Sequence, residues 1–220
     1  NNMTHELKTP ISTISLSSEM LLRMPNGEDF NKIKRYAGII YDENKRLEHQ
    51  VERVLNVAKL DKDKLVLNKE KINIEEILVQ LSDNFKLIEN KKGSEILLEI
   101  GEGSHEITAD PVHITNVIHN LTDNALKYSG ENANIKISTS RSKNELIINF
   151  VDQGIGIKKE HLKSIFDKFY RVPTGNIHNV KGYGLGLYYV KLIVESHQGS
   201  ILVQSTINKG STFTIKLPFS

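Results

Sequence analysis

The stretch "ANIKISTSRSKNELIINFVDQGIG", residues 133–156, decides the fold of the larger part of this chain. It holds two strand-like segments, 133–139 and 145–151, which are rich in Ile, Val, Phe and Thr and which we expect to pair antiparallel. The second segment runs directly into Asp152, Gly154 and Gly156. Glycines after an acid let the backbone come close to a ligand, although Asp-x-Gly-x-Gly is also an ordinary turn sequence. The stretch therefore predicts a sheet with a candidate binding site at the end of one strand.

Further strands and helices alternate around this pair. Strand-like composition recurs at 94–100, 200–206 and 211–217, and helical patterns lie at about 75–90, 111–128, 158–169 and 185–197. Strands separated by helices predict a mixed sheet with helices packed on one face, an α/β sandwich. The segment from Arg171 to Tyr183, with Pro173, Gly175, Asn176 and Gly182, has no periodicity, so we expect a mobile loop over a site.

The first 67 residues predict a helical hairpin instead, with a turn at Met24-Pro25-Asn26-Gly27. A hairpin with an apolar seam on each arm cannot bury both seams alone, so we expect a homodimer with a four-helix bundle. The alternative is that the hairpin folds back on the rest of the same chain. The expected fold class is α+β, with the hairpin over 1–67 and the α/β sandwich over 68–220. The seam residues are Leu7, Ile11, Ile14, Ser18 and Leu21 on the first arm and Ile33, Ala37, Ile40, Asn44, Leu47, Val51, Val54 and Ala58 on the second.

Composition narrows the classes of function. The chain has 29 Lys and Arg against 27 Asp and Glu, a net charge of +2, and no long basic run, so it carries no electrostatic footprint for nucleic acid. It has no cysteine, which excludes disulfides and thiolate metal sites. No apolar run approaches the roughly 18 residues of a membrane span. We therefore expect a cytoplasmic fragment without membrane contact of its own, cut from a longer protein.

The segment "HNLTDNALKYS", residues 119–129, carries the strongest polar pattern in the second part. On a helix, Asn120, Asn124 and Lys127 line one face, while Leu121 and Ala125 turn toward the core. Amide oxygens suit a hard cation such as Mg²⁺, which takes few protein ligands, and a lysine suits a phosphate charge. The alternative is a solvated stripe on an ordinary amphipathic helix.

The segment "KGYGLGLYYV", residues 181–190, places Gly182, Gly184 and Gly186 before an apolar helix. Glycines at this place expose the free N–H groups of the helix, which suits phosphate binding. The alternative is a flexible hinge followed by a helix start. No parallel βαβ unit surrounds these glycines, so they are not the dinucleotide fingerprint of a Rossmann unit.

Five motifs stand in one order along nearly the whole chain: "MTHELKTPIS", "HNLTDNALKYS", "DQGIG", "FDKFYR" at 166–171 and "GYGLGL". This order resembles the H, N, G1, F and G2 boxes of the sensor histidine kinases of two-component systems. The resemblance implies a dimerisation and phosphotransfer hairpin followed by an ATP-binding domain of the superfamily shared with gyrase, heat-shock chaperone and mismatch-repair ATPases. It also implies a response regulator receiver domain as partner and a full-length protein that can be anchored in the inner membrane.

The same resemblance implies a role for individual residues. Asp152 would bind the adenine amino group, with Gly154 and Gly156 admitting the base and Ile157 near its face. Asn124 would be the Mg²⁺ ligand. The remaining residues implied to hold the nucleotide are Asn120, Lys127, Tyr128, Phe166, Phe169, Gly182, Gly184, Leu185, Gly186 and Leu187. The chain departs from the family pattern at Asn116, where Gln is frequent, and at Tyr183, where a small hydroxyl residue is frequent.

In the first motif His5 is the candidate phosphoacceptor. It lies two residues before the seam residue Leu7, about 200° around the helix, so it should face outward. A zinc protease site would need a second His at position 9, where the chain has Thr9. A neutral imidazole can attack a γ-phosphate in line if its other proton is accepted, and the resemblance gives that role to Glu6. It also gives Thr9 a role in removing phosphate from the regulator, so that the protein would be both kinase and phosphatase.

Pro10 interrupts the hydrogen bonding of the first helix, because it has no N–H to donate to the carbonyl of Glu6. We expect a bend there that lets the hairpin change between accepting and donating phosphate. The segment 61–68, "DKDKLVLN", is the expected hinge between the two domains. Two other classes compete with the kinase: an ATPase of the chaperone or mismatch-repair type, which lacks a phosphoacceptor His on a dimerising hairpin, and a docking module that does not turn over ATP.

Overall fold

The computed structural model of the chain describes residues 2–25, 29–59, 65–89, 93–130, 132–172 and 184–219, with the side chains of 2–7, 46, 48–59 and 87–89 left undescribed. The chain divides into two compact units, one over Asn1–Leu65 and the other over Val66–Val180 and Gly184–Ser220. Each unit is described below by itself.

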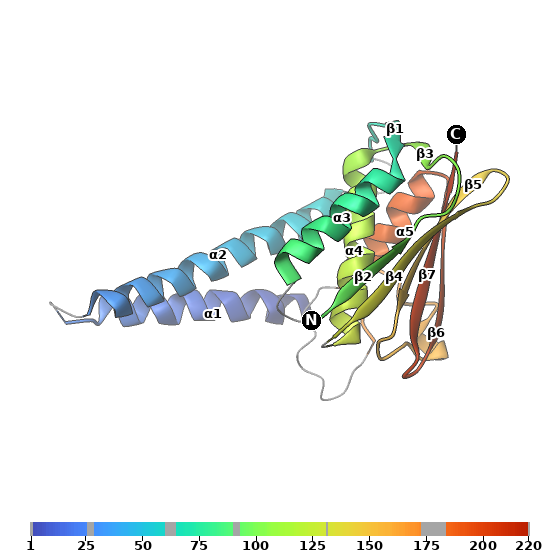
Figure 1. Cartoon of the computed structure of the whole chain (residues 1–220). Helices are drawn as coiled ribbons and strands as arrows, with labels where there is room; N and C mark the ends of the chain where they lie inside the picture. The colour runs from blue at the N-terminus through green and yellow to red at the C-terminus, as the bar shows by residue number, and fades with distance from the viewer. Residues whose placement is uncertain are drawn as a thin grey trace. The chain divides into compact units, whose positions relative to one another are not determined.

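The first unit is the predicted helical hairpin. Helix α1 (Asn2–Leu22) packs along helix α2 (Phe30–Lys59), as Figure 1 shows. Helix α1 continues through Pro10. Pro10 and Ser17 are buried and lie seven residues apart, so they share the face of α1 that meets α2. Several large apolar side chains of the hairpin stay exposed within one chain: Ile11, Leu16, Met20, Leu22, Phe30, Ile33 and Tyr41.

The second unit is built on a five-stranded mixed sheet with the strand order β2-β4-β5-β7-β6. Strands β4 and β5 pair antiparallel as predicted, with Thr139 opposite Ile148. The edge strand β2 runs parallel to β4, and the other pairs are antiparallel. The strands are β2 (Glu95–Glu99), β4 (Asn134–Arg141), β5 (Glu145–Asp152), β6 (Ser200–Thr206) and β7 (Gly210–Pro218).

Two short strands were not expected from the sequence. Strand β1 (Glu70–Asn73) pairs antiparallel with β3 (Glu106–Ala109), so they form a separate two-stranded ladder. Each has only four residues, which is too short for an alternating pattern to stand out from its surroundings.

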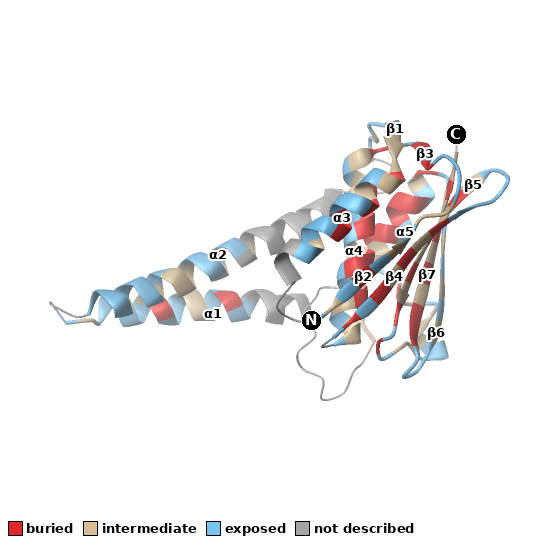
Figure 2. Ribbon diagram, viewed as in Figure 1, coloured by how far each residue is buried: buried red, intermediate tan, exposed pale blue. Residues whose placement is uncertain are grey.

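Three helices cover one face of the large sheet: α3 (Ile74–Glu89), α4 (Pro111–Ser129) and α5 (Gly186–Ser196). Buried residues are concentrated on the strands of the sheet and on the helices that cover it (Figure 2). The core therefore lies between one helical layer and one sheet, and the predicted α/β sandwich is confirmed. Its largest fully buried side chains are Ile74, Leu78, Ile114, Ile118, Leu121, Ile135, Ile137, Leu146, Ile148, Phe150, Ile193 and Ile215.

The predicted helix at 158–169 is wrong. The structure has one short 3-10 helix, Lys159–His161, followed by turns. The N–H groups of Ser164, Asp167 and Tyr170 each donate to the carbonyl three residues back, so the segment forms successive tight turns. Phe169 ends the segment with a φ of 67°, which no α-helix allows.

A buried polar network fixes the start of α4. Asp110 is the N-cap, and its Oδ1 accepts a hydrogen bond of 3.0 Å from the N–H of His113. Its Oδ2 accepts from the N–H of Asn68 at 2.9 Å, and its own N–H donates to Nε2 of His197 at 3.0 Å. Burial alone would raise the pKa of Asp110, but these N–H donors and His113 hold it below its ordinary value. The helix that carries the predicted N-box side chains is thus held at its first turn.

Candidate functional site

Asp152 lies at the end of β5 and is 6% exposed. Its Oδ1 accepts hydrogen bonds from the N–H of Gly154 at 2.8 Å and of Ser211 at 3.2 Å. Burial raises the pKa of Asp152, and the bonds from Gly154 and Ser211 offset part of that rise. Oδ1 thus accepts two backbone donors, and the Ser211 hydroxyl also bonds to the carboxylate.

The two glycines after Asp152 are required by close backbone packing. A Cβ on Gly154 would collide with the carbonyl oxygen of Tyr128, and a Cβ on Gly156 with that of Thr206. The N–H of Ile155 donates to the same Tyr128 carbonyl at 3.2 Å. The turn after β5 is therefore pressed against the end of α4, which brings the predicted adenine-binding segment beside the predicted N-box.

The N-box side chains lie on α4 with Leu121 and Ala125 buried beneath them, as the helical spacing predicted. Asn120 and Asn124 are half-buried. The amide of Asn120 donates to the carbonyl of Asn116 at 2.8 Å. In the described part of the chain, no other residue forms a hydrogen bond with the side chain of Asn124. The Nζ of Lys127 lies 5.6 Å from the centroid of the Tyr128 ring.

Tyr128 lies in the last turn of α4. Burial raises the pKa of its hydroxyl, and the charge of Arg171 lowers that pKa by a smaller amount. Ile157, on the other side of the turn after β5, is half-buried, and its N–H donates to the hydroxyl of Ser205 at 2.8 Å. Both residues therefore border the same turn as Asp152.

The last glycine of the G2 motif, Gly186, meets α4 at the start of α5. A Cβ on Gly186 would lie 3.0 Å from Oδ1 of Asn120, so the first residue of α5 sits directly against the N-box. Gly184 has a φ of 68°, and a Cβ there would collide with the carbonyl oxygen of Tyr170. Leu185 is buried and Leu187 half-buried, which anchors this turn in the core. A helix start beside amide side chains is a suitable place for phosphate.

The two phenylalanines of the F box have different positions. Phe166 packs edge to face on Phe213, with 6.5 Å between the ring centroids. Phe169 is 50% exposed, and its N–H donates to the carbonyl of Gly184 at 3.0 Å. Phe166 thus anchors the segment in the core, while Phe169 ties it to the start of α5.

Some predicted residues lie outside what the structure describes. Of the predicted loop from Arg171 to Tyr183, all residues after Val172, Gly182 included, fall outside the described residues. His5 and Glu6 lie in α1, but their side chains are not described. Thr9 is exposed on the same helix.

Sequence reasoning missed the hydroxyl pair behind Asp152. Ser211 is 7% exposed and contacts Asp152 through its N–H and its hydroxyl. Ser205 lies 3.0 Å from the Ser211 hydroxyl and donates to the carbonyl of Gly210 at 2.9 Å. The serines come from β6 and β7, more than 50 residues after Asp152, so only the pairing of β5 with β7 brings them to it.

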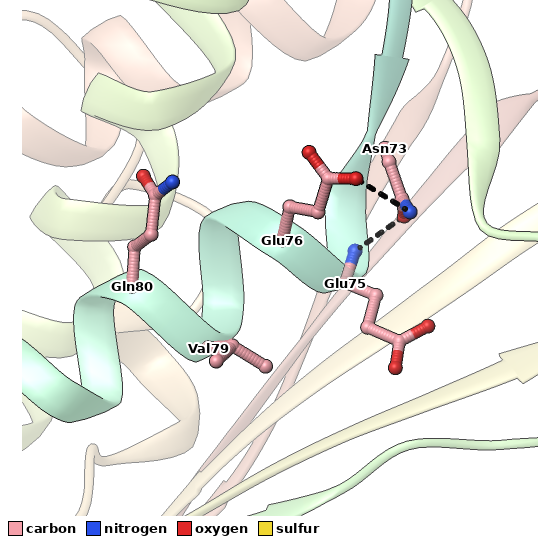
Figure 3. A pocket seen from close by; sticks show the side chains of 5 residues that line it. All are labelled: Asn73, Glu75, Glu76, Val79 and Gln80. Atoms are coloured by element: carbon pink, nitrogen blue, oxygen red, sulfur yellow. Dashed lines mark hydrogen bonds between the residues drawn. The ribbon is translucent and has the colours of Figure 1, made fainter.

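A separate hollow lies at the start of α3, lined by Asn73, Glu75, Glu76, Val79 and Gln80 (Figure 3). Asn73 Oδ1 accepts from the N–H of Glu75 at 3.0 Å and so caps the helix. Two carboxylates in its lining would repel a phosphate group, so this hollow is not a candidate nucleotide site.

Within the ranges that the structure describes, no three His, Cys, Asp or Glu side chains are grouped as they would be around a metal ion. Nor does any helix in those ranges have both the length and the apolar composition to cross a membrane.

Two family models match the chain in sequence order. The His Kinase A (phospho-acceptor) domain matches residues 1–63, and the histidine kinase-, DNA gyrase B- and HSP90-like ATPase matches residues 109–220. The second match covers all the candidate residues on α4, β5 and α5, so the domain is one that uses ATP.

Two sensor proteins are similar to this chain over nearly its whole length. The chain is 45% identical over 220 residues to the sensor protein RprX of Bacteroides fragilis, covering 99% of this chain and 42% of that protein. It is 36% identical over 217 residues to the sensor protein SrrB of Staphylococcus aureus, covering 99% of this chain and 37% of that protein. The chain thus spans less than half the length of these relatives.

Among solved structures, the histidine kinase ThkA in complex with the response regulator protein TrrA resembles the whole chain. The TM-score is 0.73 at 25% identity, with 100% of this chain and 60% of that one covered. The α+β fold, the ordered motifs and the matches to both domain families agree. The chain belongs to the sensor histidine kinases of two-component systems, the family that its motifs resemble.

Proposed function

We propose that this chain is the ATP-dependent core of a protein histidine kinase that phosphorylates itself on His5. It would then pass the phosphoryl group to an aspartate of a response regulator and also act as a phosphatase toward that regulator. The observation that carries the proposal is the junction of α4 with α5, where Asn120 Oδ1 lies 3.0 Å from the Cβ position of Gly186. This junction and Asp152 lie on either side of the end of α4. A nucleotide bound there could place its base at Asp152 and its phosphates at the junction.

In this proposal ATP binds between the turn after β5 and the start of α5. Oδ2 of Asp152 accepts the adenine amino proton, and Ser211 keeps the carboxylate oriented. Asn120, Lys127 and the first turn of α5 face the phosphates. Tyr128 and Ile157 border the base.

Mg²⁺ fits the residues present. Asn124 offers an amide oxygen that no other described residue uses, and Mg²⁺ bound to a nucleotide takes few ligands from the protein. Asn124 would hold the ion, with Asn120 beside it. When bound, Mg²⁺ neutralises phosphate charge that develops during transfer.

The transfer itself uses the imidazole of His5 as nucleophile. A ring nitrogen forms a bond to the γ-phosphorus while the bond from that phosphorus to the β–γ bridging oxygen breaks, so that ADP leaves with the electron pair. Glu6 accepts the proton of the other ring nitrogen. In the phosphatase direction, Thr9 helps to position the water that attacks the phosphoaspartate of the regulator.

We also propose that the hairpin dimerises as a four-helix bundle and that the domain boundary lies at residues 67/68. Support for the dimer comes from the exposed apolar side chains of the hairpin, such as Leu22 at 87% and Ile11 at 51%. Support for the regulator as partner comes from the likeness to the ThkA complex. This part of the protein would lie in the cytoplasm, with the full-length protein anchored in the inner membrane.

The test is incubation of the 220-residue chain with γ-labelled ATP and Mg²⁺, followed by acid or base treatment. We expect a label that survives base, is lost in acid and is absent from His5→Gln. A chain that binds ATP yet gains no such label, alone or extended upstream of Asn1, would favour the docking module. Label retained in His5→Gln would show that another residue is the acceptor.

A further inference from the structure

His161 and Tyr170 form a hydrogen-bonded pair that none of the roles above uses. Nδ1 of His161 lies 2.7 Å from the hydroxyl of Tyr170, and the two rings are tilted by 49° with centroids 6.2 Å apart. The His161 side chain is 16% exposed. Its other nitrogen, Nε2, lies 3.4 Å from Oε1 of Glu160, whose side chain is 67% exposed. The contact with Tyr170 is therefore the short and sheltered one.

The backbone around His161 fixes the position of its ring. Its N–H donates to the carbonyl of Lys158, and its carbonyl accepts from Ser164 and Ile165 at 2.9 and 3.0 Å. Ile165 is 6% exposed, so this turn is anchored in the core. Tyr170, by contrast, comes at the end of the turns, where the next described residues are Arg171 and Val172.

The backbone at Phe169 and Tyr170 packs directly against the residues at the start of α5. The N–H of Phe169 donates to the carbonyl of Gly184, and the carbonyl of Tyr170 stands so close to Gly184 that no Cβ fits. Lys168 adds a second link, since its Nζ lies 5.6 Å from the Phe169 ring centroid and 5.8 Å from that of Tyr188 on α5. Two residues after Gly184, Gly186 meets Asn120.

We propose that His161 and Tyr170 are positioning residues for ATP: their hydrogen bond holds the 167–170 turn against Gly184 and thereby sets the start of α5 against Asn120. This inference rests on the proposed function, because it assumes that the start of α5 faces the nucleotide phosphates. Neither side chain touches the nucleotide. Their loss should weaken the binding of phosphates and leave the binding of the base at Asp152 unchanged.

The test compares Tyr170→Phe and His161→Leu with the unaltered chain in equilibrium titrations with ATP and with adenosine. Loss of one net hydrogen bond should raise the Kd for ATP roughly three- to tenfold. The Kd for adenosine should stay within about twofold, because adenosine has no phosphates. The double variant should be no weaker than either single variant, since the two side chains act through one bond.

Two further variants separate positioning from general destabilisation. His161→Asn places an amide near the position of Nδ1 and should restore most of the ATP affinity. Glu160→Ala removes the exposed contacts of Glu160 with the His161 ring and with Lys158, and it should leave the ATP affinity unchanged. Urea unfolding of each variant shows whether it is folded under the titration conditions.

The outcomes separate the inference from the proposed function. Wild-type affinity for ATP in Tyr170→Phe would overturn the inference and leave the kinase proposal intact. Equal weakening of ATP and adenosine would also overturn it, because that pattern means a loosened domain. A wild-type chain that binds no ATP would overturn both.

Discussion

At Asp152 the requirements of stability and of binding oppose each other. Its carboxylate is 6% exposed, and burial raises its pKa above the ordinary value of 3.8. A raised pKa means that the ionised form is less favourable in the folded than in the unfolded chain. The protonated carboxyl group therefore favours the folded state at low pH. This contribution to stability is lost as the pH rises through the raised pKa of Asp152. At neutral pH the fold keeps a buried charge that costs free energy, and in the proposed site the adenine amino group would offset part of that cost.

Asp152→Asn should therefore remove ATP binding without harming the fold. The amide oxygen can still accept from Gly154 and Ser211, while the NH₂ group that replaces Oδ2 cannot accept the adenine amino proton. We expect the Kd for ATP to rise at least roughly tenfold and the free energy of unfolding at pH 7 to stay equal or to rise by up to ~1 kcal/mol. Titration calorimetry and urea unfolding measure the two quantities. A variant that binds ATP normally would remove Asp152 from the adenine site.

His197 gives a second prediction at this scale. Burial lowers the pKa of His197 below 6.5, and the charges of Lys69 and His113 lower it further. The hydrogen bond to the Ile193 carbonyl and the charge of Asp110 act in the opposite direction but do not cancel this effect. The neutral ring accepts the N–H of Asp110 and so stabilises the fold above pH 6.5; that contribution is lost as the pH falls toward the lowered pKa. Asp110, whose pKa is also lowered, titrates only below 3.8, outside this window.

His197→Gln should flatten the pH dependence of stability. The Gln oxygen can accept from the Asp110 N–H but does not titrate. As the pH falls below 6.5, the wild type should lose up to about 1.4 kcal/mol of stability per pH unit. The variant should lose much less, from a lower starting value because the bond to Ile193 is gone. Urea unfolding at several pH values measures this. Parallel curves for the two proteins would assign the acid sensitivity to other groups.

At the scale of elements, long periodic segments were predictable and short or turn-rich ones were not. Helix α4 carries six buried residues, and strands β4 and β5 carry three and four, all at regular spacing. The bounds of these elements agree with expectation to within a residue or two. The segment 158–169 has helix-like composition, but it forms tight turns and ends at Phe169, whose N–H donates to the carbonyl of Gly184. That contact joins residues 15 apart, so local composition does not reveal it. Ser211 escaped prediction for the same reason.

Helix α1 carries the prediction at this scale. Pro10 is buried inside it and leaves the carbonyl of Glu6 without its usual donor. Pro10→Ala should restore that bond, stabilise the helix by up to about 3 kcal/mol and change the ratio of kinase to phosphatase activity. Autophosphorylation and dephosphorylation of the regulator measure the ratio. Ser12→Ala, an exposed change on the same helix, is the control; a ratio that stays the same in both variants would contradict the proposed bend.

At the scale of the whole molecule, the exposed side chains of the hairpin distinguish two faces. Ile11 and Leu22 lie eleven residues apart, about 20° around the helix, on the side of the predicted seam, while Leu16 lies on the opposite flank beside the Thr9 position. Pro10 and Ser17 are buried between these flanks. One flank is thus available for a second copy and the other for a different partner.

Ile11→Glu should therefore shift the chain from dimer to monomer, because it places a charge in the apolar seam of the bundle. Leu16→Glu adds the same charge on the other flank and should leave the dimer intact. Light scattering after size-exclusion chromatography measures both masses. Equal dissociation of the two variants would mean that the seam was assigned to the wrong face.

The bond between Asn68 and Asp110 also bears on how such kinases can be recombined. Asp110 is 4% exposed, and its Oδ2 accepts a hydrogen bond from the N–H of Asn68 at 2.9 Å. A chimera that splices a foreign hairpin onto this ATP domain keeps that donor only if the junction lies before Asn68. Fusion at a later residue would keep this hydrogen bond only where the incoming segment supplies a backbone N–H at the same place, so the junction affects how the start of α4 is held.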